Sequence, residues 1–498
     1  MIRRLLALLL LLAGTLPATA AELRSGWYAG EPQQFLQRRD GRERLTGVDI
    51  EMVHAIATRA GHSVRFAPMA YPDLLRQVTR NEIELATGIA DTAERRAAGQ
   101  FSRAYRHDIN VLIMRRGEAA RLPAADAPAL LRGLIADPAF RLGVRAGFSY
   151  VDPALDAFLA TPEQAGRIRT APDSATNLQR LLAGEIDGFL DERLSIALLI
   201  GQSGARPFVK EAPFRLAVPL HLMFAPGVPE TTVQAFDRAI AALEEEGRLG
   251  AIAGRFRAPV LLAITLGSEW LFIFEVMGTG NSALAGYLAA RLSQFSLFGA
   301  LVLATINGSG GGVLRDLMLG RQPIGFMASP LKMFIILGTV AAAYAVGQIW
   351  NLLRGRLLLA FTLAQGFAWV RRRQLHNFTF EVVDAVALGL LTATGVAVTF
   401  GMAATPLWLW GSVMGTLTGA GAGIMRDVVR GGGVRNLRDG LYAEVALAWS
   451  LALSLYLGWR SPVIEEDEMV TVVIVTIIGV AATRMAVVIF GWRPLRLP

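Results

Sequence analysis

Apolar and polar positions are arranged differently in the two halves of the chain. From about residue 21 to 258, charged residues recur every few positions, and short apolar runs take turns with segments of helical spacing. After Pro259, long apolar runs take over and most charges fall between them. The first pattern is typical of α/β domains, whereas runs of about 20 apolar residues predict membrane-spanning helices. We therefore expect an α/β domain over residues 21–258 and a membrane domain over residues 259–498.

The first half predicts a βαβα order that occurs twice. Short apolar runs predict strands at 23–28, 64–66, 84–88, 140–144 and 186–190. Apolar positions at helical spacing predict helices at 46–60, 71–79, 149–160 and 174–183. This alternation favours a parallel sheet with helices on both faces. We expect two lobes, the first formed by residues 22–112 with 215–258 and the second by residues 113–214.

The first twenty residues have the three parts of a signal peptide. Arg3 and Arg4 form a basic start, residues 5–16 form an apolar stretch, and Ala18-Thr19-Ala20 is a small-residue cleavage site. The apolar stretch is too short to span a bilayer. An uncleaved N-terminal anchor is the alternative. In both cases we expect the α/β domain to be exported to the periplasm.

The second half contains seven candidate spans, each near the roughly 20 residues that a bilayer core needs. They are approximately 266–290, 294–314, 329–353, 378–400, 406–426, 438–458 and 468–490. Because the first domain is exported, an odd number of spans places the C-terminus in the cytoplasm. The arginine-rich segments 354–377 and 426–438 then lie inside and the acidic segment 459–467 lies outside, as the positive-inside rule requires. The loop with Arg315 and Arg321 is the one exception.

A glycine motif occurs twice among these spans. The stretch Gly310-Gly311-Gly312-Val313-Leu314-Arg315-Asp316 returns as Gly421-Ala422-Gly423-Ile424-Met425-Arg426-Asp427. Each copy ends the second span of a three-span set, so the second set is inverted in the membrane. Inverted repeats with glycine-broken helices are a device of transporters and channels. The alternatives are that the glycines only allow close helix packing, and that the Arg and Asp residues only anchor helix ends and neutralise each other.

Composition narrows the classes of function further. The chain has 498 residues, a net charge of +8 and no cysteine, which excludes disulfides, thiolate catalysis, iron–sulfur clusters and cysteine-based zinc sites. Many arginines flank apolar runs, which favours lipid contact over nucleic acid as the reason for the charge. No phosphate-binding G-x-x-x-x-G-K-[ST] motif is present, so the chain has no ATP drive of its own. We expect no cofactor and no metal site.

Four motifs in the first half resemble a known family. Residues Gly47–Val53, Thr92-Ala93-Glu94-Arg95, Phe101–Tyr105 and Gly184–Asp191 look like those of periplasmic solute-binding proteins of the polar amino-acid type, bacterial family 3. The resemblance covers about residues 22–257. It implies a periplasmic domain that binds an amino acid or a similar small solute.

The resemblance also implies a set of ligand residues. An amino acid requires a planar bidentate donor for its carboxylate and a carboxylate for its ammonium. By the family's pattern these are Arg95 and Asp191, with Thr92 in the same motif as Arg95. Backbone N–H groups at Gly147 and Ser149 would meet the ligand carboxylate, and Trp27, Tyr28 and Tyr71 would form the wall. The alternatives are a solvated Arg95, an Asp191 that caps the following helix, and aromatic residues that serve packing alone.

The second half resembles another family. The two glycine motifs, the acidic residues Glu275 and Asp384, the stretch from Arg438 to Tyr442 and the closing residues 491–494 look like the trimeric intracellular cation channels and their prokaryotic relatives, also described as glycine transporters. The resemblance covers about residues 268–494. It implies an all-α fold of seven transmembrane helices in a 3+3+1 inverted repeat, with repeats at about 266–353 and 378–458 and a last helix at 468–490. It also implies a homotrimer with a pore in each protomer, lined by broken second and fifth helices.

Taken together, these features predict a multi-pass transport protein of the bacterial inner membrane. Its periplasmic domain would bind an amino-acid-like ligand, and its membrane domain would pass a monovalent cation such as K⁺ or a small solute such as glycine. Pore or gating roles are expected for Gly310, Gly311, Gly312, Arg315, Asp316, Gly421, Gly423, Arg426, Asp427, Glu275 and Asp384. The alternative is a ligand-sensing receptor whose helices are mainly an anchor. We expect no enzymatic activity and no nucleic-acid partner.

Overall fold

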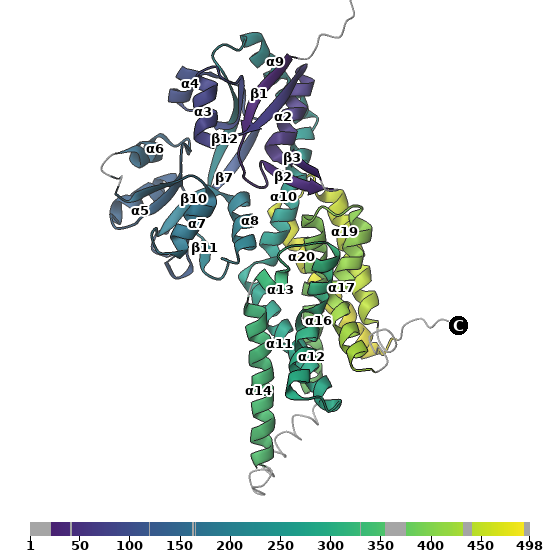
Figure 1. Ribbon diagram of the computed structural model, residues 1–498. Coiled ribbons are helices and arrows are strands. Elements are labelled where there is room, and N and C mark those ends of the chain that lie inside the picture. The colour runs from purple at the N-terminus through teal and green to yellow at the C-terminus, as the bar shows by residue number, and fades with distance from the viewer. Residues whose placement is uncertain are drawn as a thin grey trace, which may run out of the picture. The chain divides into compact units, whose positions relative to one another are not determined.

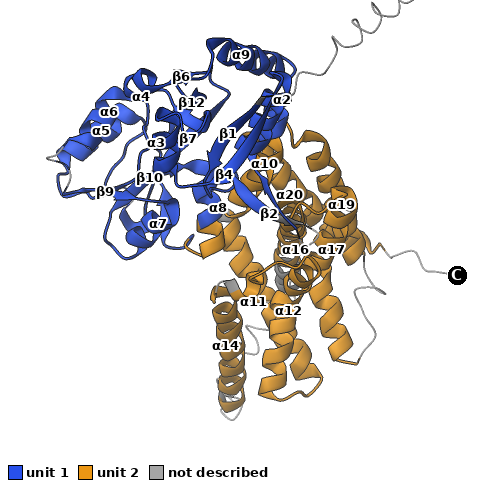
Figure 2. Cartoon of the chain, turned by 45° about the horizontal axis from the view of Figure 1, so that its top comes forward, with its two compact units in different colours: residues 1–199, 206–253 blue, residues 200–205, 254–498 orange. Residues whose placement is uncertain are grey.

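The computed structural model describes residues 21–39, 42–118, 120–161, 164, 166–328, 330–353, 375–431 and 441–492. The chain divides into two compact units, unit 1 with residues 1–199 and 206–253 and unit 2 with residues 200–205 and 254–498 (Figure 2). The predicted signal peptide and most of the arginine-rich segments 354–377 and 426–438 lie outside the described residues.

Unit 1 alternates strands and helices along the chain (Figure 1). Its strands are β1 (Ala21–Trp27), β2 (Phe35–Arg39), β3 (Arg42–Thr46), β4 (His62–Pro68), β5 (Leu85–Ala90), β6 (Gln100–Phe101), β7 (Arg106–Arg115), β8 (Leu142–Arg145), β9 (Ile168–Ala171), β10 (Gly188–Glu192), β11 (Val209–Glu211) and β12 (Leu216–Phe224). Its helices are α2 (Val48–Arg59), α3 (Tyr71–Thr79), α4 (Ala93–Ala98), the short η1 (Arg116–Glu118), α5 (Ala127–Ala136), α6 (Pro153–Ala160), α7 (Ser174–Leu182), α8 (Arg193–Ser203) and α9 (Glu230–Glu245).

Side-chain caps explain where several of these helices begin. Thr92, Asp126, Asp152 and Asp173 each accept a hydrogen bond from the backbone N–H three residues later, at the starts of α4, α5, α6 and α7. Such caps satisfy N–H groups that have no partner within the helix. Four of the helix starts in unit 1 are therefore set by local sequence.

The main sheet of unit 1 has two halves that share crossing strands. Its order is β4-β1-β5-β12-β7-β10-β8-β9. The outer pairs β1–β4 and β8–β9 are parallel, whereas β12 and β7 in the middle run antiparallel to their neighbours. The first part of β7 pairs with β12 and its second part pairs with β10. This arrangement confirms the predicted two-lobed α/β domain, and the predicted lobe limit after residue 112 falls within β7.

Unit 2 is helical. Its elements are α10 (Arg248–Leu266), which begins at the end of unit 1, α11 (Glu269–Leu292), α12 (Leu297–Met318), α13 (Gly325–Ala328), α14 (Leu331–Leu353), α16 (Leu375–Gly401), α17 (Leu407–Val429), α19 (Tyr442–Arg460) and α20 (Glu466–Phe490). Helix α11 packs against α12 and α14, and α16 packs against α17 and α20. The two groups meet where α12 contacts α17 and α11 contacts α16.

Five helices among the described residues are long and apolar enough to cross a membrane: 248–266, 297–318, 331–352, 381–401 and 466–490. Four of them coincide with predicted spans. The fifth is α10, which was not among the seven spans predicted from the sequence. The other three predicted spans form α11, α17 and α19, whose Gly, Ser, Trp and acidic residues lower their hydropathy. The chain therefore has an all-helical C-terminal region with five candidate membrane spans among the described residues, and the count of seven spans stays a prediction.

The hydrogen bonds of Asp187 in lobe 2 give a testable contribution to the stability of unit 1. Its carboxylate accepts hydrogen bonds from the side chains of Arg115 and Arg141 at 2.8–3.0 Å and from the backbone N–H of Arg141 at 2.8 Å. Burial alone would raise the pKa of Asp187, but these hydrogen bonds outweigh burial and lower the pKa to about 2. A lowered pKa contributes stability above the unfolded value near 4 that is lost as the pH falls towards 2.

We predict that Asp187→Asn destabilises unit 1 by about 2 kcal/mol at pH 7, and that the difference from wild type disappears between about pH 4 and pH 2. Calorimetric unfolding of the full chain across this pH range measures the difference. A stability difference between variant and wild type that persists unchanged at low pH would contradict the stabilising role of the ionised Asp187 carboxylate. Asp126→Asn, at an exposed helix cap, is the control.

Candidate functional site

Unit 1 contains a small cavity at the strand ends of its two lobes. Its volume is about 40 Å³. At about 10–15 Å³ for each water molecule, it has space for only a few waters. Its lining includes aromatic residues, hydroxyl groups and four charged side chains, namely Tyr28, Tyr71, Phe148, Ser149, Ser195, Arg106, Asp108, Arg145 and Glu192. A cavity of this size with fixed charges fits a small polar solute.

Three aromatic rings form one wall. The rings of Tyr28 and Tyr71 meet edge to face with centroids 5.2 Å apart, and those of Tyr71 and Phe148 do so at 4.7 Å. Gly147 precedes Phe148 with φ of 76°, where a Cβ would lie 3.5 Å from the Tyr71 ring. Burial raises the pKa of both tyrosines, so their hydroxyls stay protonated and can donate hydrogen bonds.

Lobe 1 contributes a closed network around Asp49. The Asp49 carboxylate is fully buried and accepts from Arg106 Nε at 2.5 Å and Arg106 Nη2 at 3.0 Å. The Tyr105 hydroxyl donates to Asp49 at 2.5 Å and Gln34 Nε2 donates at 3.0 Å. Arg106 also pairs with Asp108. Two carboxylates thus surround the Arg106 guanidinium, and its charge is fully compensated.

Lobe 2 contributes Arg145, Asp191 and Glu192 from adjacent strand ends. Arg145 ends β8, and Asp191 and Glu192 end β10, which lies parallel to β8. Arg145 Nη1 lies 3.9 Å from Asp191 Oδ1. Burial raises the pKa of Asp191. Glu192 accepts from the backbone N–H groups of Leu194 and Ser195, so it caps α8.

The structure brings some of the predicted ligand residues to this cavity and leaves others outside it. Tyr28, Tyr71 and Ser149 line it. Asp191 is buried behind the lining, Trp27 is half-buried at the end of β1, and the Thr92 side chain caps α4. The Arg95 guanidinium donates to the carbonyls of Ala90 at 2.9 Å and Gly147 at 2.6 Å. The predicted Arg95–Asp191 clamp stays a prediction.

Sequence reasoning did not single out the four charged residues of the lining, Arg106, Asp108, Arg145 and Glu192. Two of them had a usable signal. Arg106 directly follows the motif that ends at Tyr105, and Arg145 stands two positions before Gly147. The segment at Gly147 was predicted to meet the ligand and the segment ending at Tyr105 carried the family resemblance, so their charged neighbours were natural further candidates.

In unit 2, the predicted breaks at the glycine motifs are wrong. Helix α12 continues through Gly310–Gly312, and α17 continues through Gly421–Gly423. Each glycine weakens a helix by only about 0.5–1 kcal/mol relative to alanine, whereas a break in hydrocarbon leaves backbone groups unpaired at several kcal/mol each. At Gly311 the motif serves close packing, because a Cβ there would lie 2.6 Å from the carbonyl oxygens of Leu417 and Thr418.

The two motifs share one arrangement of charges. Arg315 Nε donates to Asp316 at 2.8 Å, and Arg426 Nε donates to Asp427 at 3.0 Å. Asp316 and Asp427 are both buried. Asn307 of α12 links α11 to α17. It donates to the carbonyl of Ser282 on α11 at 2.6 Å and accepts from Arg426 Nη1 on α17 at 3.4 Å. The Arg–Asp sequence thus has the same geometry in both copies.

The two acidic residues predicted early in the first and fourth spans have different surroundings. Glu275 pairs with Lys332 at 2.8 Å, and this pair joins α11 to α14. Asp384 is half-buried on α16, close to Arg484 of α20. One turn earlier on α16, Glu381 lies 3.5 Å from Arg484.

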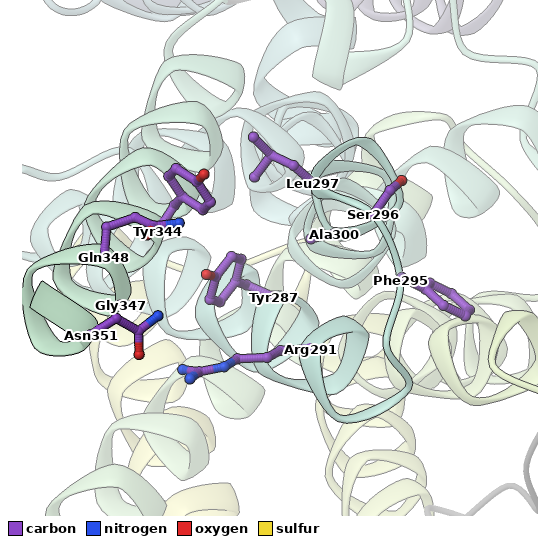
Figure 3. A pocket seen from close by; sticks show the side chains of 10 residues that line it. All are labelled: Tyr287, Arg291, Phe295, Ser296, Leu297, Ala300, Tyr344, Gly347, Gln348 and Asn351. Atoms are coloured by element: carbon purple, nitrogen blue, oxygen red, sulfur yellow. The ribbon is translucent and has the colours of Figure 1, made fainter. Parts of the chain in front are cut away.

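A separate recess of about 220 Å³ lies between α11, α12 and α14 (Figure 3). Tyr287 points towards α14, which carries Tyr344, Gln348 and Asn351, and Arg291 lies beside it on α11. None of the predicted pore residues lines this recess.

Comparison with known proteins matches the two halves separately. Residues 23–258 match the family described as bacterial extracellular solute-binding proteins, family 3. One solved structure that the comparison matches is an amino acid ABC transporter substrate-binding protein from Streptococcus pneumoniae, bound to L-arginine. It is 19% identical and covers 47% of this chain and 93% of its own, with a TM-score of 0.37. We assign the two-lobed fold of unit 1 from its strand order and not from this match.

Residues 272–348, which include α12 and most of α11 and α14, match the family described as glycine transporter. The inner membrane protein YadS of Escherichia coli, of the UPF0126 group, is 27% identical over 43% of this chain and 91% of its own length. A UPF0126 membrane protein of Deinococcus radiodurans is 30% identical over 38% of this chain and 76% of its own length.

The chain belongs to the UPF0126 membrane protein family. Its UPF0126 half follows a solute-binding domain of family 3, so both predicted resemblances are confirmed at this level. Both matched families are named for binding or transport, in agreement with the expectation of a protein without enzymatic activity.

The packing at Gly311 gives a prediction for the UPF0126 half. Gly311→Ala places a methyl group against two backbone carbonyls and should destabilise unit 2 by about 1–3 kcal/mol. The matched control is Gly312→Ala, because the nearest atom to its Cβ is 3.8 Å away at Arg315. Here the better helix propensity of alanine should leave stability equal or higher. Thermal unfolding of both variants in detergent measures the two stabilities. Equal losses of stability in Gly311→Ala and Gly312→Ala would contradict the packing role of Gly311.

Proposed function

We propose that this chain is a transport protein of the bacterial inner membrane whose periplasmic domain binds a small amino-acid-like solute and whose UPF0126 half passes K⁺ or a small solute such as glycine. The observation that carries the proposal is the cavity of about 40 Å³ between the lobes of unit 1. It lies in a domain of a solute-binding family, in the same chain as a membrane region of a transporter-like family.

The charges of the cavity support a zwitterionic ligand. Cationic and anionic side chains line the same small volume, namely Arg106 and Arg145 with Asp108 and Glu192, and of these Arg106 and Asp108 pair with each other. A solute with one carboxylate and one ammonium can pair with charges of both signs. The aromatic wall of Tyr28, Tyr71 and Phe148 supplies apolar contact for a short side chain.

The repeated charge arrangement in the membrane region supports a pathway that is lined by α12 and α17. Charged residues buried among apolar helices are expensive and typically serve a function. Arg315–Asp316 and Arg426–Asp427 form the same pair in both copies, as expected of an inverted repeat. By analogy with the cation-channel family, we place these pairs and the adjacent glycines at a pathway in each protomer of a homotrimer of 3+3+1 helices.

For seven spans from α11 to α20, without α10, the exported domain and the charges of the loops favour one orientation. The positive-inside rule places the basic C-terminal residues in the cytoplasm and the acidic segment near Glu465 outside. The periplasmic domain then lies on the side from which solutes arrive.

We predict that the full chain in proteoliposomes passes K⁺ or radiolabelled glycine above the rate of protein-free vesicles. Asn307→Ala should lower this flux, because it removes the link from α11 to Arg426 of α17. Asn351→Ala, at the recess on α14, is the matched control and should conduct like wild type.

The measurement also separates transport from the receptor alternative. Absence of K⁺ and glycine flux, with and without amino acids added outside, would refute the transport proposal. Binding of an amino acid by such a flux-inactive protein would favour a sensing receptor.

A further inference from the structure

The recess between α11, α12 and α14 is lined by polar side chains from two facing helices (Figure 3). On α14, the lining residues Tyr344, Gln348 and Asn351 recur every three or four positions, so they share one face of a largely apolar helix. On α11, Tyr287 and Arg291 are one turn apart and line the same recess. Polar groups on membrane-spanning helices are costly unless they face a partner or a cavity. Two polar faces that meet at one recess therefore indicate a binding site.

The polar side chains of the recess are available to a ligand. Tyr287, Arg291, Tyr344, Gln348 and Asn351 have no hydrogen-bond or ion-pair partner among the residues that the structure describes. Tyr287 is only 7% exposed, and its side chain points towards α14. Buried polar groups are normally hydrogen-bonded, so an unpartnered buried hydroxyl calls for an explanation. The volume of about 220 Å³ is well above that needed for a single water molecule and admits a small charged group.

The charge of the recess favours an anion. Arg291 lines it, and none of its lining residues is acidic. The acidic residues of α11, α12 and α14 are Glu269, Glu275 and Asp316. At 1.5 Å per residue, Glu275 lies about 24 Å from Arg291 along α11, and Asp316 lies about 30 Å from Ser296 along α12. The three helices that form the recess thus supply no carboxylate to Arg291.

Two further features add positive potential at the same end of these helices. Ser296 lines the recess and is the N-terminal cap of α12, where its hydroxyl accepts from the backbone N–H of Gly299 at 3.2 Å. The positive end of the α12 dipole therefore lies at the recess. Arg430, directly after α17, donates to the hydroxyl of Ser293 at 3.2 Å in the turn between α11 and α12. A second guanidinium is thus held close to this turn.

The rim of the recess is apolar and exposed. Each of the three helices carries exposed apolar side chains directly beside lining residues, namely Leu288 and Leu292 on α11, Phe298 on α12, and Ile349 and Leu352 on α14. Acyl chains can cover such a rim, whereas a soluble anion makes no use of it. In the orientation proposed above, this end of α11 and α14 faces the cytoplasm. Basic pockets between membrane helices on that side are suited to lipid headgroups.

We propose that the recess binds an anionic phospholipid of the inner leaflet. Arg291 pairs with the phosphate, the Tyr287 hydroxyl donates to it, and the acyl chains lie on the apolar rim. Tyr344, Gln348 and Asn351 supply hydrogen bonds to the rest of the headgroup. None of the predicted pore residues lines the recess, so this site is independent of the proposed transport pathway.

The test is lipid binding by the full chain in detergent, measured by native mass spectrometry. The probes are dioleoyl phosphatidylglycerol, which is anionic, dioleoyl phosphatidylcholine, which has the same chains and no net charge, and inorganic phosphate, which has no chains. Wild type should bind phosphatidylglycerol about 5-fold more tightly than phosphatidylcholine, the ratio expected for one cation at a membrane surface. Equal binding of the two lipids would overturn the proposal.

Two arginine variants locate the site. Arg291→Gln should bind both lipids with the same affinity, because it removes the charge that distinguishes them. Arg321→Gln is the matched control, since it removes one arginine just beyond the other end of α12 and should keep the 5-fold preference. Retention of the preference in Arg291→Gln, or its loss in both variants, would overturn the assignment to the recess.

Two further variants change the recess without removing the arginine. Tyr287→Phe should weaken both lipids by the same factor of about 3, because both carry a phosphate. Asn351→Asp places a carboxylate in the recess and should abolish the preference for phosphatidylglycerol. An unchanged preference in Asn351→Asp would count against the site even if Arg291→Gln did not fold. The unfolding temperature of each variant without added lipid shows whether it is folded.

Inorganic phosphate distinguishes the two sources of the anion. It should not displace phosphatidylglycerol at equal concentration, because it cannot cover the apolar rim. Displacement that depends on Arg291 would overturn the lipid assignment in favour of a soluble anion. Each of these failures leaves the proposed transport function untouched, since flux through the chain is measured separately.

Discussion

A buried ion pair between Asp49 and Arg106 fixes the centre of the solute-binding domain. Asp49 lies in the first turn of α2, and Arg106 begins β7, the strand that passes from one lobe to the other. Tyr105, Gln34 and a glycine at position 88, where a Cβ would lie 3.2 Å from the carboxylate, complete the surroundings. Removal of one partner from such a pair typically costs about 3–5 kcal/mol. The crossing strand, and with it the floor of the cavity, is therefore held in one position relative to lobe 1.

This pair also determines which charges remain for a ligand. Because Arg106 is saturated, its charge serves structure, and the cation with spare donors is Arg145 at the opposite lobe. Among the acids, Asp49 and Asp108 both pair with Arg106, whereas Glu192 lines the cavity and caps α8.

Sequence reasoning predicted the order of elements well and the geometry of the site only in part. The βα alternation, the capping residues and the family motifs follow from local spacing, and Tyr28, Tyr71 and Ser149 line the cavity as expected. The direction of a long side chain does not follow from local spacing, so the contact of Arg95 with Gly147 and the position of Arg145 required the fold. In the membrane region, Gly311 was expected to break a helix, but tertiary packing against Leu417 and Thr418 uses the missing side chain instead.

We propose that the solute binds in the cavity between the lobes. A cryo-electron microscopy map of the full chain in lipid nanodiscs, saturated with its tightest-binding amino acid, tests this claim most directly. We expect density for the solute within the cavity, beside Tyr28, Tyr71 and Phe148. An empty cavity with solute density elsewhere on unit 1, or between the helices of unit 2, would contradict it.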